Sequence, residues 1–459
     1  MSDYAIIGAG PCGLAMARAL QRVGIASDGY EASRDVGGLW DISNPRSTMY
    51  ESAHLISSRT TTEFSEFPMR TTVDYPGHRA LKQYFDDYAD AFSLREGFAF
   101  DTRVTRVEPD GEGGWSLTAV GPDGERTKRY RGVILANGTL AEPNVPEFAG
   151  EFDGEIMHTS AYKHPSRLAG KRVLVVGAGN SGCDIAVDAV HHAASVDMSV
   201  RRGYYFVPRY LFGRPSDTLN QGRPMPRPVK QFVDKRLLQA FTGDPVKFGF
   251  PKPDYKIYES HPIVNTLILN HLGQGDLRIM PDVDRLEGRT VHFKRGGRGD
   301  RGSKGAAGAA ASRGGDRASA DYDLILLATG YKLDYPMVAR EHLNWRGAAP
   351  ELFLNIFPPA FDGLYVMGMV EASGLGWQGR FEQAELIAAY LHAEQGDPAR
   401  AERFRRRVSD DPWPDLTAGY RYLGLDRMSY YVNKDAYRGA VRGETTAMAR
   451  PLRRLEEAR

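Results

Sequence analysis

A strand, a glycine-rich turn and a helix follow one another twice in this chain, and this repeat constrains the fold more than any other feature. The first copy runs from the apolar stretch Tyr4 to Ile7 through Gly8-Ala9-Gly10-Pro11-Cys12-Gly13 into an alanine-rich helix pattern that ends near Val23. The second runs from Arg172 to Val176 through Gly177-Ala178-Gly179-Asn180-Ser181-Gly182 into a helix pattern from Cys183 to Val190. The repeat predicts an α/β fold with two Rossmann-like dinucleotide-binding domains.

The order of the elements predicts that the second domain is inserted into the first. One buried-strand pattern, Gly132 to Leu135, ends in Ala136-Asn137-Gly138 and closes the first fold before the second glycine turn begins. A similar pattern, Asp323 to Leu327, ends in Ala328-Thr329-Gly330 and returns the chain to the first fold. We therefore expect a discontinuous domain of residues 1–165 and 326–459, with residues 166–325 as the inserted domain. A chain of 459 residues is long enough for more than one core.

Residues 294–320 are predicted to form a disordered surface loop within the inserted domain. This stretch holds eight Gly, seven Ala and seven basic residues, and it has no side chain with which to build a core. A short arginine-glycine run inside it is similar to RNA-binding segments, but the rest of the chain argues against that partner. With 59 Lys+Arg against 58 Asp+Glu the net charge is +1, so no overall field would hold nucleic acid.

The composition also limits compartment, metals and membranes. The two cysteines, Cys12 and Cys183, cannot form a disulfide framework, and no Cys/His group has the spacing of a metal site. The amino end has no basic segment of a signal peptide, and no apolar run reaches the roughly 18 to 20 residues that cross a bilayer. We therefore expect a cytoplasmic protein without metal, nucleic-acid or membrane partners; a homodimer is left open.

The first glycine turn has the features of a dinucleotide site. Gly8, Gly10 and Gly13 would let the backbone and the helix start approach a pyrophosphate, although such a turn can also simply pack a helix on a strand. Glu31 ends a second strand-like run, Ile25 to Tyr30, where an acceptor for ribose hydroxyls belongs. The acid makes the functional interpretation the better one.

The second turn predicts a different nucleotide. Gly177, Gly179, Asn180, Ser181 and Gly182 form the turn, and Arg201 and Arg202 stand where the first unit has its acid. Guanidinium groups pair with the additional ribose phosphate of NADP, which an acid would repel. The alternative is a solvated basic pair, and Ser181 can serve as a helix cap alone.

Motifs between and after the two turns resemble those of the flavin-containing monooxygenases, a family of class B flavoprotein monooxygenases. The segment after Glu31 contains Gly37, Gly38, Leu39 and Trp40, which is similar to the GGxW pattern that wraps FAD in this family. Residues Phe152 to Lys163 match its fingerprint FxGxxxHxxxYK at every fixed position. The related Baeyer-Villiger monooxygenases have a similar fingerprint that ends in Trp, which makes them the less favoured subgroup.

The resemblance implies an enzyme that binds FAD in the first domain and NADPH in the second, with Thr329 and Gly330 in the family's second crossover motif. It implies oxygenation of a soft nucleophile, an amine nitrogen or sulfur, by dioxygen through a flavin hydroperoxide. Ketone oxygenation of the Baeyer-Villiger type and a non-catalytic FAD/NADPH-binding redox sensor are the alternatives. Disulfide reductases also pair two such folds, but they need two neighbouring cysteines, and Cys12 and Cys183 lie in opposite turns.

Two positions remain open after this comparison. Many members of the family place an Asn beside the flavin between Tyr50 and Pro68, but ungapped counting puts Ile56 there. Ser57 is the predicted catalytic substitute, because a one-residue bulge could bring its hydroxyl into that place. His158 of the fingerprint has two interpretations, a hydrogen bond that fixes the crossover or proton transfer, of which we favour the first. By resemblance, a helix from about Gln378 to His392 points its amino end at the flavin.

Overall fold

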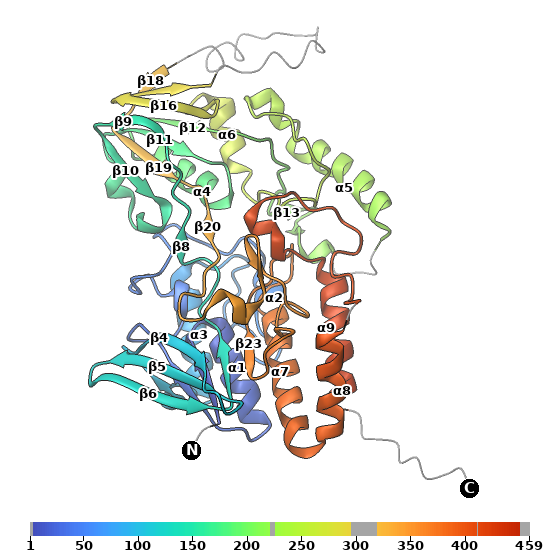
Figure 1. Ribbon diagram of the computed structural model, residues 1–459. Coiled ribbons are helices and arrows are strands. Elements are labelled where there is room, and N and C mark those ends of the chain that lie inside the picture. Colours follow the sequence, from blue (N-terminus) through green and yellow to red (C-terminus); the bar gives the residue numbers. More distant parts are fainter. Residues whose placement is uncertain (1–2, 221–224, 295–318, 411, 450–459) are drawn as a thin grey trace.

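Two parallel sheets form where the apolar runs of the repeat predict them, as the computed structural model shows for residues 3–220, 225–294, 319–410 and 412–449 (Figure 1). The runs Tyr4–Ile7 and Gly132–Leu135 are buried along their whole length, as expected for parallel strands covered on both faces. In spatial order, the first sheet consists of β23 (Leu364–Val366), β7 (Gly132–Leu135), β1 (Tyr4–Ile7), β2 (Ser27–Tyr30) and β3 (Phe98–Ala99).

The second sheet repeats this plan around the second glycine turn. All neighbouring pairs in it are parallel, and β11 lies between β19 and β12. In spatial order it consists of β10 (Glu155–His158), β19 (Leu324–Leu327), β11 (Arg172–Val176), β12 (Ser195–Ser199) and β15 (Leu277–Met280). The predicted fold class, α/β with Rossmann-like units, is confirmed by this architecture.

The chain passes back and forth between the two sheets. After the second sheet is complete, β23 returns to pair with β7 in the first sheet. The strands β10 and β19 belong to the second sheet, although the predicted boundaries at residues 166 and 325 assign β10 and the end of β19 to the first domain. The division into an FAD domain and an NADPH domain stays a prediction.

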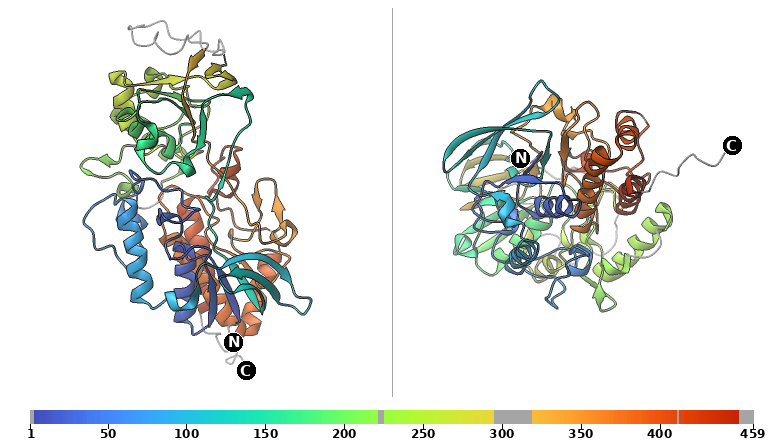
Figure 2. Two further views of the ribbon diagram at one scale, coloured as in Figure 1. Left: turned by 90° about the vertical axis from the view of Figure 1, so that its left-hand side faces the viewer. Right: turned by 90° about the horizontal axis from the view of Figure 1, so that it is seen from below.

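Smaller antiparallel sheets and one mixed sheet complete the two units. Viewed from the side, the units lie at opposite ends of the molecule, and two extended segments run between them (Figure 2). These segments pair as β8 with β20. The remaining strands are β4 (Arg103–Pro109), β5 (Trp115–Gly121), β6 (Gly124–Tyr130), β8 (Glu142–Pro143), β9 (Ala149–Phe152), β13 (Tyr210–Leu211), β14 (Arg214–Pro215), β16 (Val283–Gly288), β17 (Thr290–Phe293), β18 (Ser319–Asp321), β20 (Tyr331–Lys332), β21 (Trp345–Arg346) and β22 (Ala349–Pro350).

The helices cover the sheets and separate their cores. Helix α7 is buried along most of its length and packs against α1, α8 and α9, which places one core beneath the first sheet. Helix α4 packs against α6 and the second sheet, around a second core. The helices are α1 (Pro11–Arg22), α2 (Arg59–Thr62), α3 (His78–Ala91), α4 (Asn180–Val190), α5 (Arg227–Thr242), α6 (Leu267–Gln274), α7 (Gln378–Gly396), α8 (Pro398–Ser409) and α9 (Lys434–Ala449).

Two predicted elements differ in extent from those observed. The apolar sequence Gly363 to Val370 predicts a buried strand, but only β23 forms, because Gly368 turns the backbone at φ 82°. The amide of Gly368 donates a 2.9 Å hydrogen bond to Oε1 of Gln383, outside the ladder. Helix α7 continues beyond His392 to Gly396. The predicted loop 294–320 lies, apart from its ends, outside the described residues. Its ends are held together, because β17 and β18 pair antiparallel with His292 opposite Ser319.

Candidate functional site

The first glycine turn lies at the carboxyl end of β1 and opens helix α1. Gly8 has φ 106°, and a Cβ atom there would lie 2.6 Å from the carbonyl oxygen of Ala136. A Cβ atom on Gly13 would lie 1.7 Å from the carbonyl oxygen of Gly8. The fold itself therefore requires these two glycines, one for its backbone conformation and one for the close packing of helix on strand.

The middle glycine of this turn has a different surrounding. A Cβ atom on Gly10 would make only ordinary contacts, the nearest at 3.5 Å from the Cα of Gly38. Gly10 is also the N-cap of α1, and no side chain caps the helix there. The amides at the start of α1 therefore point toward a place where an anion could accept their hydrogen bonds.

The GGxW segment lies directly beside the first turn. Gly38 has φ 58°, and a Cβ atom on it would approach the Cα of Gly10 to 3.0 Å, so the two backbones pass close together. Trp40 packs edge-on against Trp377, with ring centroids 5.7 Å apart. The carbonyl oxygen of Leu39 accepts a hydrogen bond from the Ser47 hydroxyl. The segment thus connects the glycine turn to the beginning of α7.

Glu31 is buried at the end of β2 and turns toward the first glycine turn. Its Oε2 accepts a hydrogen bond of 2.6 Å from the backbone amide of Ala9, between Gly8 and Gly10. Its Oε1 accepts bonds of 2.8 Å from both the amide and the hydroxyl of Ser33. An ionised carboxylate offers about four acceptor positions, so it retains capacity for a further donor. The sequence places this acid correctly beside the turn.

The second glycine turn follows the same plan at the end of β11. Gly177 has φ 103°, and a Cβ atom there would lie 2.6 Å from the carbonyl oxygen of Ala328. A Cβ atom on Gly182 would lie 2.3 Å from the carbonyl oxygen of Gly177. The middle glycine, Gly179, has no described atom within 4 Å of the position its Cβ would take, and it begins α4 without a side-chain cap. A requirement for glycine at this position would therefore come from a bound ligand and not from the fold.

The two polar residues of the second turn differ in what they contact. The side-chain Oδ1 of Asn180 accepts a 2.7 Å bond from the amide of Val264, and its Nδ2 donates to the carbonyl of Pro262 at 3.3 Å. Asn180 therefore holds the loop 262–264 in place. Ser181 is exposed at the start of α4. It does not act as the N-cap, since that position belongs to Gly179.

Arg201 and Arg202 follow β12, as predicted, but their surroundings differ. Arg201 is exposed and makes no ion pair with the part of the chain that the structure describes. Arg202 is half-buried, and its Nε lies 3.3 Å from a carboxylate oxygen of Asp254. Arg201 is therefore the more available of the two for an external phosphate.

The crossover motifs bind each other where the two extended segments meet. Asn144 donates its backbone amide to the carbonyl of Gly330 at 2.9 Å, and Thr329 donates its hydroxyl to the carbonyl of Asn144. His158 bonds the same Gly330 carbonyl through Nε2 at 3.0 Å, while its Nδ1 accepts from Ser160. Burial lowers the pKa of His158. Both ring nitrogens are thus used within the protein, which agrees with the crossover interpretation of this residue.

The last two fingerprint residues bond to different units, Tyr162 to the second and Lys163 to the first. The Tyr162 hydroxyl donates to a carboxylate oxygen of Asp188 on α4 at 2.5 Å. The Lys163 ammonium donates to the backbone carbonyls of Ser47 and Met49, and burial lowers its pKa. The fingerprint therefore fixes the segment that leads toward residues 56 and 57.

Sequence analysis missed a half-buried carboxylate at the same junction. Asp184 on α4 accepts hydrogen bonds from the Tyr50 hydroxyl at 3.2 Å and from the Asn265 amide at 2.5 Å. Burial raises its pKa. The i,i+4 spacing of Asp184 and Asp188 on the helix after the second turn was the available signal, because it puts two carboxylates on one face.

Ile56 and Ser57 lie just before Ser58, the N-cap of the single turn α2. Both side chains are half-buried, and Ser58 behind them is only 1% exposed. The hydroxyl of Ser57 makes no hydrogen bond within the described ranges, whereas that of Ser58 is fully engaged by its neighbours. Ser57 therefore stays the candidate for the position of the missing amide.

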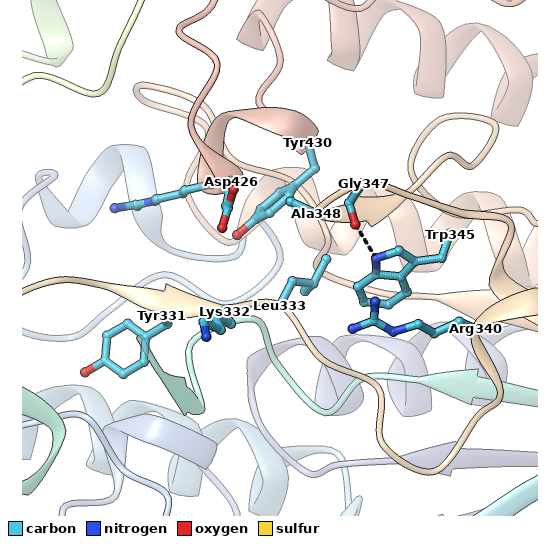
Figure 3. A pocket seen from close by; sticks show the side chains of 10 residues that line it. Tyr331, Lys332, Leu333, Arg340, Trp345, Gly347, Ala348, Asp426 and Tyr430 are labelled. Atoms are coloured by element: carbon cyan, nitrogen blue, oxygen red, sulfur yellow. Dashed lines mark hydrogen bonds between the residues drawn. The ribbon is translucent and has the colours of Figure 1, made fainter. Parts of the chain in front are cut away.

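A small cavity of about 170 Å³ lies beside the second crossover (Figure 3). Its wall includes Tyr331 and Lys332 of β20, and Trp345, whose indole Nε1 donates to the carbonyl of Gly347 at 2.9 Å. Sites for drug-sized ligands have volumes of roughly 300 to 1,000 Å³, so this cavity is too small for a dinucleotide. It borders the crossover without belonging to either glycine turn.

The described ranges contain no group of His, Cys, Asp or Glu side chains arranged to hold a metal ion. Within the same ranges, none of the helices is long and apolar enough to cross a membrane. The two thiols, Cys12 and Cys183, are unpaired and lie in opposite turns. A neighbouring dithiol, as a disulfide reductase needs, is therefore not formed by them.

Comparison with known proteins identifies the family. Residues 2–302 match the model of the flavin-binding monooxygenase-like family. The chain is 30% identical over 395 residues to indole-3-pyruvate monooxygenase YUCCA1 of Oryza sativa subsp. japonica, covering 81% of this chain and 87% of that protein. It is 28% identical over 394 residues to flavin-containing monooxygenase 5 of Mus musculus, covering 81% and 69% respectively.

Solved structures agree in fold. The open structure of cyclohexanone monooxygenase has a TM-score of 0.71 at 18% identity, covering 97% of this chain and 96% of that one. The S-allyl-L-cysteine S-oxygenase of Allium sativum has a TM-score of 0.64 at 19% identity, covering 96% and 88%. The resemblance inferred from the motifs is confirmed: the chain belongs to the flavin-binding monooxygenase-like family and is a flavin-dependent monooxygenase.

Proposed function

We propose that this protein is an NADPH- and dioxygen-dependent monooxygenase that oxygenates a soft nucleophile, an amine nitrogen or a sulfur. The observation that carries the proposal is the pair of glycine turns. In each, the outer glycines are required by the fold, while the middle one leaves space in front of an uncapped helix start. Two such cradles in one chain fit two dinucleotides.

The first turn is the proposed FAD site. Amides at the start of α1 would meet the pyrophosphate, and Gly10 leaves room for it. The free acceptor capacity of Glu31 would take a ribose hydroxyl. Residues Gly38 to Trp40 border the same space. Gly8 and Gly13 contribute by shaping the turn.

The second turn is the proposed NADPH site. Gly177, Gly179 and Gly182 would form the cradle, with the start of α4, including Asn180 and Ser181, supplying amides. Arg201 would pair with the 2′-phosphate, and Arg202 would contribute less because Asp254 already neutralises part of its charge. Thr329 and Gly330 would hold the crossover between the two sites.

The chemistry itself belongs to the cofactors. When bound, FAD accepts a hydride equivalent from NADPH and supplies the activated dioxygen. Overall, one NADPH, one proton and one O₂ are consumed, one oxygen atom enters the substrate, and the other leaves as water. The residues of the chain bind and orient both nucleotides and exclude water. Ser57 is the proposed hydroxyl at the position where other family members have an amide.

Ketone oxygenation of the Baeyer-Villiger type is the second candidate. The observation that favours it is Ile56, because the side chain expected at a nitrogen- or sulfur-oxygenating flavin is absent from that position. The named relatives act on different substrates, an indole-3-pyruvate in one case and S-allyl-L-cysteine in another.

We further propose that the enzyme works in the cytoplasm, where Cys12 and Cys183 stay reduced.

The test compares three substrate classes with one enzyme preparation. The purified protein should carry FAD, and NADPH oxidation should be stimulated by a thioether or a tertiary amine. With ¹⁸O₂, one labelled atom should appear in the product by mass spectrometry. Lactone or ester from a cyclic or linear ketone, with no sulfoxide or N-oxide, would replace the first proposal by the second. Slow NADPH oxidation that no substrate of the three classes stimulates would contradict both.

A further inference from the structure

The segment that carries Ile56 and Ser57 continues into α2, a single helical turn with little stability of its own. An isolated turn is unstable in water because nucleation costs more than its few hydrogen bonds return. At its end, the carbonyl of Thr62 accepts a 2.9 Å bond from the amide of Trp377, just before α7. A Cβ atom on Gly376 would lie 2.2 Å from the carbonyl oxygen of Thr61, so the two backbones nearly touch. The position of α2 is therefore tied to the start of α7.

The beginning of α2 is held by a carboxylate that is 159 residues away in sequence. Asp217 Oδ2 accepts a 2.7 Å bond from the amide of Ser58 and a 3.0 Å bond from its hydroxyl. The Thr61 hydroxyl donates to the same oxygen. A carboxylate at a helix amino terminus satisfies an orphan amide and also opposes the partial positive charge of that end.

Asp217 belongs to a hairpin region that reaches from the second unit onto the first. The Tyr75 hydroxyl donates to the carbonyl of Arg209 at 2.5 Å, and the Tyr210 hydroxyl donates to Asp74 at 2.9 Å. The rings of Tyr75 and Tyr210 pack edge-to-face at 5.5 Å. These contacts come from β13 and the residue before it, while Asp217 follows β14. The hairpin therefore rests on the first unit independently of the Asp217 bonds.

A third element faces the same carboxylate. Lys434, at the start of α9, is attracted electrostatically by Asp217, although burial lowers its pKa overall. A Cβ atom on Gly374 would lie 3.9 Å from the side chain of Lys434. Asp217 thus lies near α2 and the start of α9, neither of which is close to it in sequence.

We propose that Asp217 is a positioning residue for the monooxygenase reaction. It fixes α2, and with it Ile56 and Ser57, in a set orientation against the start of α7. This inference rests on the proposed function, since it assigns the segment 56–62 to the reaction site. The residue that positions the site comes from the inserted unit, so the correct docking of that unit and the correct placement of Ser57 are set together.

The test uses Asp217→Asn in the full-length protein and two measurements. Asparagine has the same shape, but it is uncharged and presents one acceptor oxygen where the carboxylate presents two. Amide hydrogen exchange over residues 57–62 should accelerate about tenfold, which corresponds to a loss of about 1.4 kcal/mol in local stability. In the FAD-loaded enzyme, hydrogen peroxide released per NADPH consumed should rise at least twofold, while bound FAD and the KM for NADPH stay unchanged.

Tyr210→Phe is the matched control, because it removes another bond between the same hairpin and the first unit. It should leave exchange over residues 57–62 and peroxide release unchanged. Equal effects of the two variants, or unchanged exchange in Asp217→Asn, would overturn the inference. If Asp217→Asn does not fold, Thr61→Val tests the same contact from the other side and should also accelerate exchange. Wild-type protein that never oxidises NADPH would refute the proposed function, while the exchange measurement would still decide whether Asp217 holds α2.

Discussion

Other segments of the chain pack around the first glycine turn, whereas the second turn has few neighbours among the described residues. Around the first, Gly38 passes within close contact of Gly10, and a buried Glu31 bonds the turn from beneath. Around the second, no described atom lies within 4 Å of the Cβ position of Gly179, and Arg201 is exposed. The same backbone plan therefore produces two kinds of site. An enclosed cradle suits a nucleotide that stays bound, and an open one suits a nucleotide that enters and leaves at each turnover.

The sharpest test of this difference is a valine at the middle glycine of the first turn. Gly10→Val adds methyl groups beside the backbone of Gly38, in the space proposed for the pyrophosphate. We expect the affinity for FAD to fall on the order of a hundredfold, about 2.7 kcal/mol. The flavin absorbance of the purified variant, relative to its protein absorbance, measures this loss.

Gly179→Val is the matched variant in the second turn. Because nothing described lies within 4 Å of the new Cβ, the fold and the bound flavin should be retained. The KM for NADPH should rise at least tenfold, as a branched side chain now occupies the cradle. Full flavin in Gly10→Val, or loss of flavin in Gly179→Val, would show that the two turns have been assigned in the wrong order.

The loop that supports the second turn contains a histidine that should make the stability of the protein depend on pH. His261 lies next to Pro262, whose carbonyl binds Asn180, and its Nδ1 lies 3.1 Å from the Tyr431 hydroxyl. Burial, with a contribution from Arg427, lowers the pKa of His261 from 6.5 to about 4. The unfolded chain therefore binds a proton between pH 6.5 and 4 that the folded protein does not, so stability falls as the pH falls through this range.

The loss attributable to this histidine should approach about 3 kcal/mol at pH 4. Replacing His261 by Gln removes the titrating group and retains hydrogen-bonding capacity. Wild type and variant should therefore converge in stability as the pH is lowered from 7 to 4, in urea denaturation followed by fluorescence. A stability difference that stays constant across this range would mean that His261 is accessible to protons in the folded protein.

How well the sequence predicts a feature depends on how far apart in the sequence the residues that form it lie. The glycine turns, Glu31 and the arginines are local patterns, and the structure places each at the end of its strand. The hydrogen bonds from Ser58 to Asp217 and from Tyr50 to Asp184 join residues 159 and 134 positions apart. No short motif encodes such pairs, because their partners are brought together only when the second unit docks on the first. The apolar sequence Gly363 to Val370 predicts a longer strand than β23, because the side chains stay buried past Gly368 while the hydrogen-bonded ladder does not continue.

The two arginines after β12 provide a test within the second site. Arg201→Gln should raise the KM for NADPH about tenfold, because a charge-assisted bond to phosphate contributes roughly 1.5 to 3 kcal/mol and exposure reduces that value. Arg202→Gln should raise it only two- to threefold, because Asp254 already neutralises part of the Arg202 charge. The KM for NADH should change little in either variant. If both substitutions weaken NADPH and NADH equally, the arginines do not contact the 2′-phosphate.

The smallest effect is expected from deleting residues 296–319, most of which lie outside the described ranges, and joining the two strands by a short turn. The strand residues that remain on either side of this stretch are already paired, with Thr290 opposite Asp321 and Val291 opposite Ala320. A two-residue Asn-Gly turn is the favoured connection for such a hairpin. The closure entropy of a chain segment changes only slowly with its length, so the free energy of unfolding should change by less than about 1 kcal/mol.

Because the ladder ends on the small sheet β18-β17-β16-β9 and not on either glycine turn, flavin content and NADPH turnover should also be retained. Thermal unfolding and steady-state kinetics of the shortened protein measure both. A lower turnover with an unchanged melting temperature would instead give this stretch a part in nucleotide or substrate binding, and the second site would then be less open than its described surroundings indicate.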